Sequence, residues 1–316
     1  MPAPAALMPL LLSLVVLFSC ASLPACTASP EMPLWFDSFE RLPVNTVTVG
    51  GHRIAYLDRG EGPSIVLIHG FGGSMWQWEY QQTALSQGHR LITLDLLGSG
   101  LSDKPDMAYT PEDMVAFFTG FLDALGLAKA TLVGNSMGAG LAMGMALAHP
   151  ERVERLVLIA GLPAVIHEDL TGPLIRRALD SRVPVWLAEF GNWVLGRSVT
   201  EAVLEEIVCD HSLLTPAVVE RAYRNRERPG LVPAAMAVAR SIPLWEAGFA
   251  TRLRDIAVPT LIVWGDEDRV FAPRAGTKLA AAIPGARLER IAKAGHMPQW
   301  ERPEPVNRLI LDFARP

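Results

Sequence analysis

A serine in a tight, glycine-flanked turn is the residue of this chain best suited to covalent chemistry. Ser136 lies in the Gly-Asn-Ser-Met-Gly motif at 134–138, between the apolar run Ala130–Val133 and a segment rich in Ala, Leu and Met. Glycine and serine are also common in ordinary turns. Between a strand and a helix, however, this spacing predicts a nucleophile elbow. Such a turn strains the serine backbone and points the N-terminus of the next helix toward developing negative charge.

A serine hydroxyl needs a base, and the base needs an acid that orients it. The best candidate base is His296, in the Ala-Gly-His-Met-Pro loop after the last predicted strand. The other histidines fit solvated positions, helical segments or, for His69, the shaping of an oxyanion loop. For the acid, the apolar strand Leu261–Trp264 runs into Gly-Asp-Glu-Asp at 265–268. The residues alone leave its three carboxylates open, and two of them would be solvated turn or capping groups.

The elements that must position these residues alternate between strand and helix signals. The predicted strands are 45–50, 52–58, 64–68, 90–94, 130–133, 155–159, 260–264 and 287–291. The predicted helices are 75–87, 111–126, 139–149 and 305–313. The two glycines at 50–51 predict a hairpin between the first two strands. Alternation of this kind predicts an α/β fold, a mostly parallel sheet with helices on both faces.

This alternation is interrupted after residue 162, where helical patterns replace strand signals. Five short helices, separated by Gly and Pro, are predicted at 174–179, 184–195, 200–209, 216–226 and 233–241. Inserted between two strands, they would form a cap over the carboxyl ends of the strands, where ligands bind in open α/β sheets. The predicted divisions are an α/β core at 31–162 and 246–316 and a helical cap at 163–245.

Composition excludes several classes of function. Half of the 316 residues are hydrophobic, which gives a sizeable core, and the net charge is −5. No basic stripe is interleaved with aromatic residues, so nucleic-acid binding is disfavoured. There is no Cys pair or His/Cys cluster at metal-ligand spacing and no Gly-x-Gly-x-x-Gly after a strand. We therefore expect neither a metal nor another cofactor.

The first thirty residues form a different kind of segment. Leu7–Phe18 is uncharged and apolar, as in the h-region of a signal peptide, and is shorter than the roughly 20 residues that span a bilayer. The alternative is a helix that folds onto the domain. Cys20 and Cys26 follow in stretches that loosely resemble lipoprotein boxes, although Phe or Pro occupies the position two before each cysteine. We expect residues 1–30 to direct export, either as a cleaved signal or as a lipoprotein anchor that attaches the chain to a membrane.

The serine, the acid and the histidine follow one another along the chain in the order found in α/β-hydrolases. The chain resembles the α/β-hydrolase fold superfamily over about residues 44–314. The matching pieces are His-Gly-Phe-Gly-Gly at 69–73, Asp-Leu-Leu-Gly-Ser-Gly-Leu-Ser-Asp at 95–103, the elbow, Gly-Asp-Glu-Asp at 265–268 and Gly-His at 295–296. The resemblance implies an eight-stranded, mostly parallel sheet with an inserted helical cap. It selects Asp268 as the acid, with Asp266 in reserve. It also assigns the oxyanion hole to the backbone N–H groups of Phe71 and Met137.

The type of nucleophile narrows the reaction. Haloalkane dehalogenases and epoxide hydrolases of this fold have Asp at the elbow, so Ser136 argues against both. Our main expectation is hydrolysis of a small, hydrophobic carboxylic ester through an acyl-enzyme, with His296 activating the water. Three tryptophans of the predicted cap either face this substrate or pack the cap on the core: Trp186, Trp193 and Trp245.

An alternative reaction is cleavage of a carbon–carbon bond. The elbow and the segment Gly295–Pro303 also resemble meta-cleavage product hydrolases, which act on vinylogous diketones. Those cytoplasmic enzymes have Trp after the histidine, where this chain has Met297, and an oxyanion loop richer in Gly and Pro. Arg176 or Arg177 would bind the carboxylate of such a substrate. A non-catalytic ligand-binding protein of the same fold is a third possibility, which the complete Ser/Asp/His set disfavours.

Overall fold

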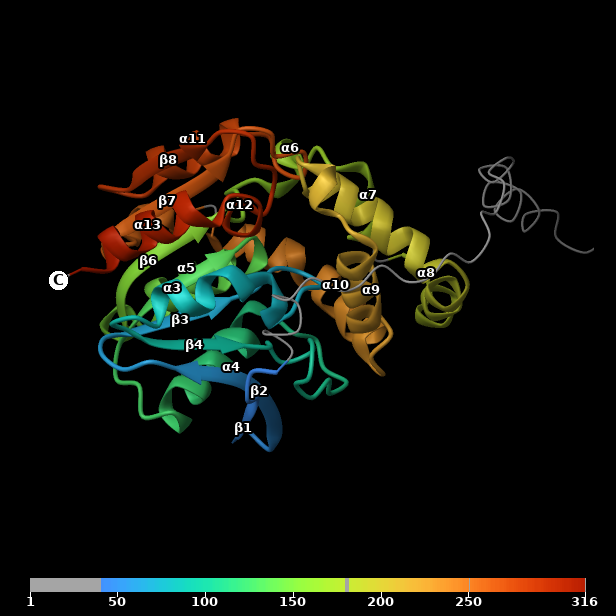
Figure 1. The fold of residues 1–316 in the computed structure, drawn as a ribbon, viewed down its shortest axis with the longest axis horizontal. Helices are drawn as coiled ribbons and strands as arrows, with labels where there is room; N and C mark the ends of the chain where they lie inside the picture. Colours follow the sequence, from blue (N-terminus) through green and yellow to red (C-terminus); the bar gives the residue numbers. More distant parts are fainter. Residues whose placement is uncertain (1–40, 180–181, 250, 316) are drawn as a thin grey trace, which may run out of the picture. The chain divides into compact units, whose positions relative to one another are not determined.

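An eight-stranded sheet is the centre of the described part of this computed structural model, residues 41–179, 182–249 and 251–315. Its strands are β1 Asn45–Val49, β2 His52–Arg59, β3 Ser64–Ile68, β4 Arg90–Leu94, β5 Ala130–Asn135, β6 Val153–Ile159, β7 Thr260–Gly265 and β8 Arg287–Ile291. The strand order is β1-β2-β4-β3-β5-β6-β7-β8 (Figure 1). β2 is antiparallel to both of its neighbours, and all the other neighbouring strands are parallel. The predicted fold class is confirmed.

Helices cover both faces of this sheet. One face packs on α4 Pro111–Ala124, α5 Met137–Ala148 and α11 Arg274–Ala282, and the other packs on η1 Met75–Gln81, α3 Gln82–Leu85 and α13 Pro303–Ala314. The strand residues alternate between the two cores: Val66 and Ile68 of β3 join the first, and Ile65 and Leu67 join the second. This two-residue period is the expected one for a strand buried on both sides.

Local signals set several element ends. Gly50 and Gly51 take φ values of 56° and 85° in the predicted hairpin turn. At the start of α4 the Thr110 side chain accepts the N–H of Asp113, whose carboxylate accepts the N–H of Thr110, which is a capping box. The predicted helix at 75–87 is wrong in detail, because the chain forms the 3-10 helix η1, kinked at Trp78, and then the single turn of α3.

Between β6 and β7 the structure has five α-helices among the described residues. They are α6 Ile166–Asp169, α7 Pro173–Ala178, α8 Val185–Ile207, α9 Pro216–Arg226 and α10 Leu231–Phe249. The two helices predicted at 184–195 and 200–209 are one continuous helix, α8. Gly196 lies inside it, and a Cβ there would be 3.0 Å from a ring atom of Tyr223 on α9. This glycine therefore allows close packing of α8 on α9 and does not end the helix.

The remaining short helices are η2 Pro150–Arg152, η3 His211–Leu213, η4 Leu253–Asp255 and α12 Pro298–Glu301. Among the described residues no helix is both long and apolar enough to cross a membrane. The signal or anchor segment predicted at 1–30 lies outside the described residues, and the boundaries drawn between core and cap stay a prediction.

Candidate active site

The predicted elbow lies at the carboxyl end of β5. Ser136 follows this strand with φ 53° and ψ −116°, and α5 begins at the next residue. A Cβ on Gly134 would lie 2.4 Å from the backbone nitrogen of Ala139, and one on Gly138 would lie 2.3 Å from a backbone carbonyl oxygen of β3. The first of these atoms belongs to the backbone of α5 and the second to the backbone of β3, so neither can give way as a flexible side chain could. Only glycine fits the two flanking positions, and the serine takes the strained conformation between them.

The predicted base and acid are in contact. His296 Nδ1 lies 2.9 Å from Asp268 Oδ2, and both side chains are buried. The second carboxylate oxygen, Oδ1, accepts the N–H groups of Val270 at 2.8 Å and Phe271 at 3.0 Å. The Phe271 ring also packs edge-on against the imidazole, with centroids 5.5 Å apart. These contacts fix the orientation of the imidazole through Nδ1, and His296 lines the same pocket as Ser136.

The other candidates from the sequence lie elsewhere. Asp266, the reserve acid, accepts from Arg290 at 2.6 Å on the surface, and Glu267 is exposed. His69 is fully buried, its Nε2 accepts the Leu96 N–H at 3.0 Å, and burial lowers its pKa. Because backbone groups already occupy both ring nitrogens of His69, this residue shapes its loop as expected.

A cavity of about 70 Å³ contains the serine and the histidine. The two residues assigned to the oxyanion hole, Phe71 and Met137, line it as well. The Gln77 amide oxygen accepts the N–H of Gly70 at 3.2 Å and so holds the loop that carries Phe71. Apart from these groups the wall is mainly apolar: Leu162, Ile175, Leu179, Val203, Ile207 and Ile242.

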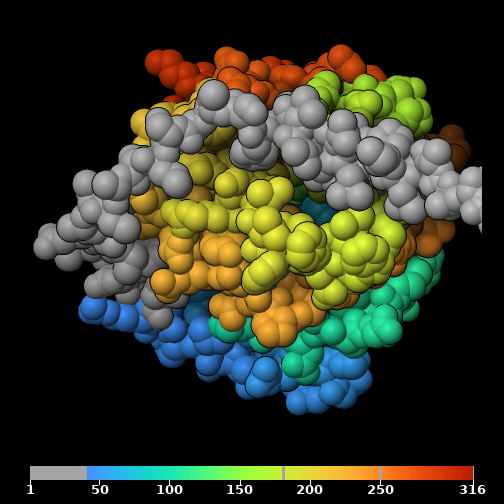
Figure 2. Space-filling model, turned by 90° about the vertical axis from the view of Figure 1, so that its right-hand side faces the viewer, coloured from blue at the N-terminus to red at the C-terminus, as the bar shows by residue number. Residues whose placement is uncertain are grey.

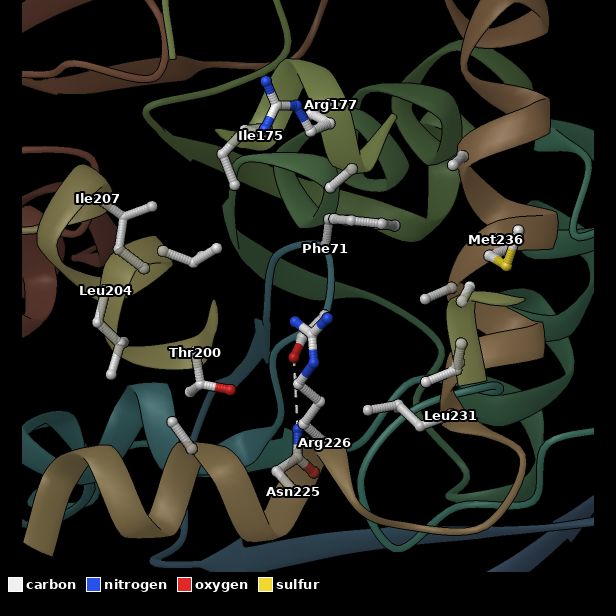
Figure 3. A pocket seen from close by; sticks show the side chains of 18 of the residues that line it. Phe71, Ile175, Arg177, Thr200, Leu204, Ile207, Asn225, Arg226, Leu231 and Met236 are labelled. Carbon is white, nitrogen blue, oxygen red and sulfur yellow. Dashed lines mark hydrogen bonds between the residues drawn. The ribbon is translucent and has the colours of Figure 1, made fainter. Parts of the chain in front are cut away.

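A larger cavity of about 280 Å³ adjoins this serine pocket (Figure 3). The two share Phe71, Gln77, Ile175, Val203 and Ile207 in their walls. Helices α8, α9 and α10 supply most of the other lining residues, which are predominantly apolar. Arg177, one of the two predicted carboxylate binders, also lines the larger cavity, whereas Arg176 donates to the backbone carbonyl of Leu170. The described residues include no cluster of acidic, His or Cys side chains able to hold a metal ion.

Arg226 is a cation of the larger cavity that the sequence reasoning did not single out. Its guanidinium projects into the space between α8 and α10 (Figure 3) and is bound by the side-chain oxygen of Asn192. Burial lowers its pKa. The larger cavity therefore combines an apolar wall with two guanidinium groups.

Two buried side chains that the sequence reasoning also missed hold the histidine loop. Asn135 Nδ2 donates to the carbonyl of His296 at 3.1 Å, which connects the elbow strand to this loop. Glu301 accepts the N–H groups of Gly295 and Cys209, each at 2.7 Å, and burial raises its pKa. The loop of the candidate base is thus bound both to the nucleophile strand and to the chain just after α8.

A buried ion pair joins the core to α9. Arg221 donates to both carboxylate oxygens of Glu79 at 2.9 and 2.8 Å, and the indole N–H of Trp300 donates to Glu79 at 2.8 Å. The guanidinium also stacks over the Trp76 ring, 5.0 Å from its centroid. No sequence signal points to this pair, because the two residues are 142 positions apart.

The three cap tryptophans divide into two groups. Trp245 is buried and packs in the main core, as one of the two sequence interpretations expects. Trp186 and Trp193 are 67% and 77% exposed and line neither the serine pocket nor the larger cavity. Both interpretations are wrong for these two residues.

The match to a family model assigns the chain to a class of protein. The alpha/beta hydrolase fold model matches residues 63–303, so the chain belongs to the alpha/beta hydrolase fold family. This confirms the family resemblance seen in the sequence motifs. The three known proteins compared below are hydrolases, and hydrolysis is the reaction class that we assign to the chain.

Three known proteins illustrate this family resemblance. A 2-hydroxy-6-oxo-6-phenylhexa-2,4-dienoate hydrolase of Burkholderia cepacia is 30% identical over 276 residues, 85% of this chain and 94% of the relative. The meta-cleavage product hydrolase CumD of Pseudomonas fluorescens IP01 is 28% identical with a TM-score of 0.72, over 85% of this chain and 96% of CumD. A bacterial membrane phospholipase A is 26% identical with a TM-score of 0.71, over 88% of each chain.

Proposed function

We propose that the chain hydrolyses carboxylic esters that carry a neutral, apolar acyl group. The observation that carries this proposal is the lining of the serine pocket. Its described residues offer apolar side chains and the amides of Gln77 and Asn135 but no Lys or Arg. A dienoate substrate carries a carboxylate on the same short chain as the bond to be cleaved, and burying that charge in the serine pocket without a cation is costly. A neutral acyl chain could instead extend into the larger cavity.

The geometry supports a course of four steps. The Ser136 oxygen attacks the ester carbonyl carbon while His296 Nε2 takes the hydroxyl proton. Asp268 stabilises the resulting imidazolium through its Nδ1–H group. The N–H groups of Phe71 and Met137 bind the oxyanion. The tetrahedral intermediate then expels the alcohol, which takes the proton from His296. Water, deprotonated by the same imidazole, attacks the acyl-enzyme; the acid leaves and the imidazolium returns the proton to the Ser136 oxygen.

Carbon–carbon bond hydrolysis is the second candidate, and the comparisons with known proteins favour it. The Burkholderia and Pseudomonas relatives cited above are named for substrates or products of that chemistry. The membrane phospholipase A, whose name denotes an ester-cleaving enzyme, supports the first candidate. Under the second candidate Arg177 or Arg226 would bind the substrate carboxylate from the larger cavity. Met297 would occupy the position where those enzymes typically have Trp.

A substrate panel separates the two reactions. Purified protein is assayed on p-nitrophenyl acetate, on p-nitrophenyl esters of longer acyl chains and on a ring-fission diketone. We expect ester turnover, abolished in Ser136→Ala and unchanged in Ser198→Ala, a control on the exposed side of α8. Diketone cleavage with no turnover of any ester would replace the first candidate by the second. Activity retained by a folded Ser136→Ala protein would overturn both.

Export and membrane attachment through residues 1–30 remain proposals based on sequence alone, and the comparisons lend them no support. Cell fractionation of the natural producer, with mass spectrometry of the mature N-terminus, would test them. We expect a processed or membrane-bound chain. A full-length, unprocessed protein in the cytosol would contradict this.

A further inference from the structure

Exposed large apolar side chains are concentrated on one segment of the molecule. Five of the eight found among the described residues lie between positions 183 and 194, one just before α8 and four in its first turns. They are Val183 at 40% exposed, Trp186 at 67%, Phe190 at 56%, Trp193 at 77% and Val194 at 52%. Monomeric proteins rarely leave large aromatic side chains together in solvent, and such a patch marks an interaction site. We call these five residues the α8 stripe.

The α8 stripe follows the period of a helix. Residues 186, 190, 193 and 194 are spaced i, i+4, i+7 and i+8, which places them on one side of α8. The rings of Phe190 and Trp193 are in contact, with centroids 6.0 Å apart. Figure 2 looks onto the side of the molecule that carries these helices, and α8, in yellow, projects toward the viewer. The four stripe residues within α8 therefore lie side by side on one face of the helix.

The same helix also lines the larger cavity, through Ala188 and through residues farther along that include Val203 and Leu204. Val183 belongs both to the α8 stripe and to this lining. Whatever covers the stripe is consequently in contact with the edge of the substrate cavity.

Charges near the α8 stripe largely cancel. Arg197, one turn beyond Trp193, pairs with Glu220, which also binds Arg224 at 2.9 Å. A hollow beside Trp193 is lined by Arg226 and Arg228 but also by Glu189 and Glu227. A partner of strong net charge gains little here, whereas an apolar surface with zwitterionic head groups fits.

We propose that the α8 stripe inserts into the surface of a phospholipid bilayer. Trp and Phe are the side chains that settle at the boundary between head groups and acyl chains. The three aromatic side chains expose on the order of 400 Å² of surface, about half of what each partner of a stable protein–protein interface buries. The stripe is thus too small to hold a second copy of this chain by itself, but large enough for interfacial insertion.

The length of chain before the described residues supports a membrane as the partner. The apolar run at 7–18 is separated from the first described residue by the 22 residues 19–40. An extended chain of that length reaches about 70 Å. An apolar N-terminus could thus bring the chain to a bilayer without determining which face meets it, and the α8 stripe would determine the orientation. If the stripe lies in a bilayer, apolar esters would enter the larger cavity beside it, and that consequence rests on the proposed function. The binding of the stripe to lipid does not.

Quenching by brominated lipid tests the insertion directly. The full chain carrying Ser136→Ala, which prevents hydrolysis, is mixed with phosphatidylcholine vesicles brominated near the top of the acyl chains. The same measurement on the additional variant Trp186→Phe/Trp193→Phe isolates the fluorescence of these two residues by difference. We expect the fluorescence of Trp186 and Trp193 to be about twofold lower with brominated vesicles than with unbrominated vesicles, because interfacial side chains lie about 5–10 Å deep. A Trp245→Phe variant should lose only an unquenched, buried component.

Each other outcome overturns the proposal. Vesicle binding without quenching of Trp186 and Trp193 would mean that only another part of the chain, such as the N-terminal apolar run, contacts lipid. The α8 stripe would instead bind a second copy of the chain if three results came together. These are a blue shift in the emission of the two residues that increases with protein concentration, a dimer in sedimentation, and no quenching by bromine. Unchanged emission from both residues would mean that the stripe stays in water. Activity on esters enters none of these readouts, so failure of the proposed function would be seen separately.

Discussion

The reacting groups at the sheet edge and the helices that cover them are held in different ways. Around Ser136, Asp268 and His296 the constraints come from backbone: at Gly134 and Gly138 an added Cβ would lie only 2.4 and 2.3 Å from backbone atoms, and two N–H groups bind one carboxylate oxygen of Asp268. The wall contributed by α8 and α10 consists of apolar side chains around a cavity of about 280 Å³. Changes at the sheet edge should therefore abolish the reaction, whereas changes in the wall should alter which substrate reacts.

The largest expected effect tests the sheet edge. In Asp268→Asn an amide would face His296 and stabilise the wrong tautomer, so kcat should fall roughly 10⁴-fold. Asp266→Asn, which only loses a surface pair with Arg290, should stay within about twofold. Steady-state kinetics on a p-nitrophenyl ester measures both, and circular dichroism should show both variants folded. The reverse ranking would show that the acid is wrongly assigned.

This contrast also explains how far the sequence could lead. Ser136, His296 and the acid loop could be predicted because each lies in a local motif in which glycine or a strand end dictates the conformation. The choice of Asp268 came from family resemblance, and its contact with His296 supports that choice. The continuous α8 was not predictable from its composition. A glycine that ends one helix allows close packing in another, and only the neighbouring Tyr223 distinguishes the two.

The junction between the two regions should give the next largest effect. Arg221→Met leaves the buried Glu79 without its guanidinium partner and should lower the free energy of unfolding by about 3 kcal/mol. Arg224→Met, on the same helix but in an exposed i,i+4 pair, should cost about 0.5 kcal/mol or less. Urea unfolding of both variants decides. Equal losses would show that this ion pair does not anchor α9.

Such junction residues have no local signature. Glu79 and Arg221 meet across 142 positions, and Glu301 meets Cys209 across 92. In the sequence each is one charged residue among many, and a charged residue is by default assigned to the surface. Their burial follows from tertiary contacts alone, so long-range pairing was the part of the site that the sequence could not supply.

Glu301 tests whether the cap and the histidine loop depend on each other. The carboxylate accepts N–H groups with both oxygens. In Glu301→Gln an NH2 group must face one of these donors, so the loop of His296 should shift and kcat should fall on the order of 10²-fold. KM should change little, and Glu304→Gln on the surface is the matched control. A loss confined to KM would instead place Glu301 in substrate binding.

The same variant has a pH signature. Burial raises the pKa of Glu301 above its ordinary value of 4.5, so the folded state resists ionisation more than the unfolded state does. The difference in free energy of unfolding, wild type minus Glu301→Gln, should therefore be greatest below about pH 4.5. It should decline as the pH rises through the raised pKa. Urea unfolding at several pH values between about 4 and 8 measures this. A difference that grows with pH would contradict the raised pKa.

The smallest effect should come from the cavity wall and should depend on the substrate. Val203 on α8 borders both the serine pocket and the larger cavity, so Val203→Phe narrows the passage between them. We expect kcat/KM for a long-chain ester to fall roughly 10-fold, while a short ester that stays in the serine pocket keeps its rate. Val194→Phe, on the exposed side of the same helix, should change neither. If Val203→Phe lowered kcat/KM equally for both esters, the wall would constrain the reacting groups themselves. The proposed separation, with the reaction set by the sheet edge and the substrate choice by the cap, would then be wrong.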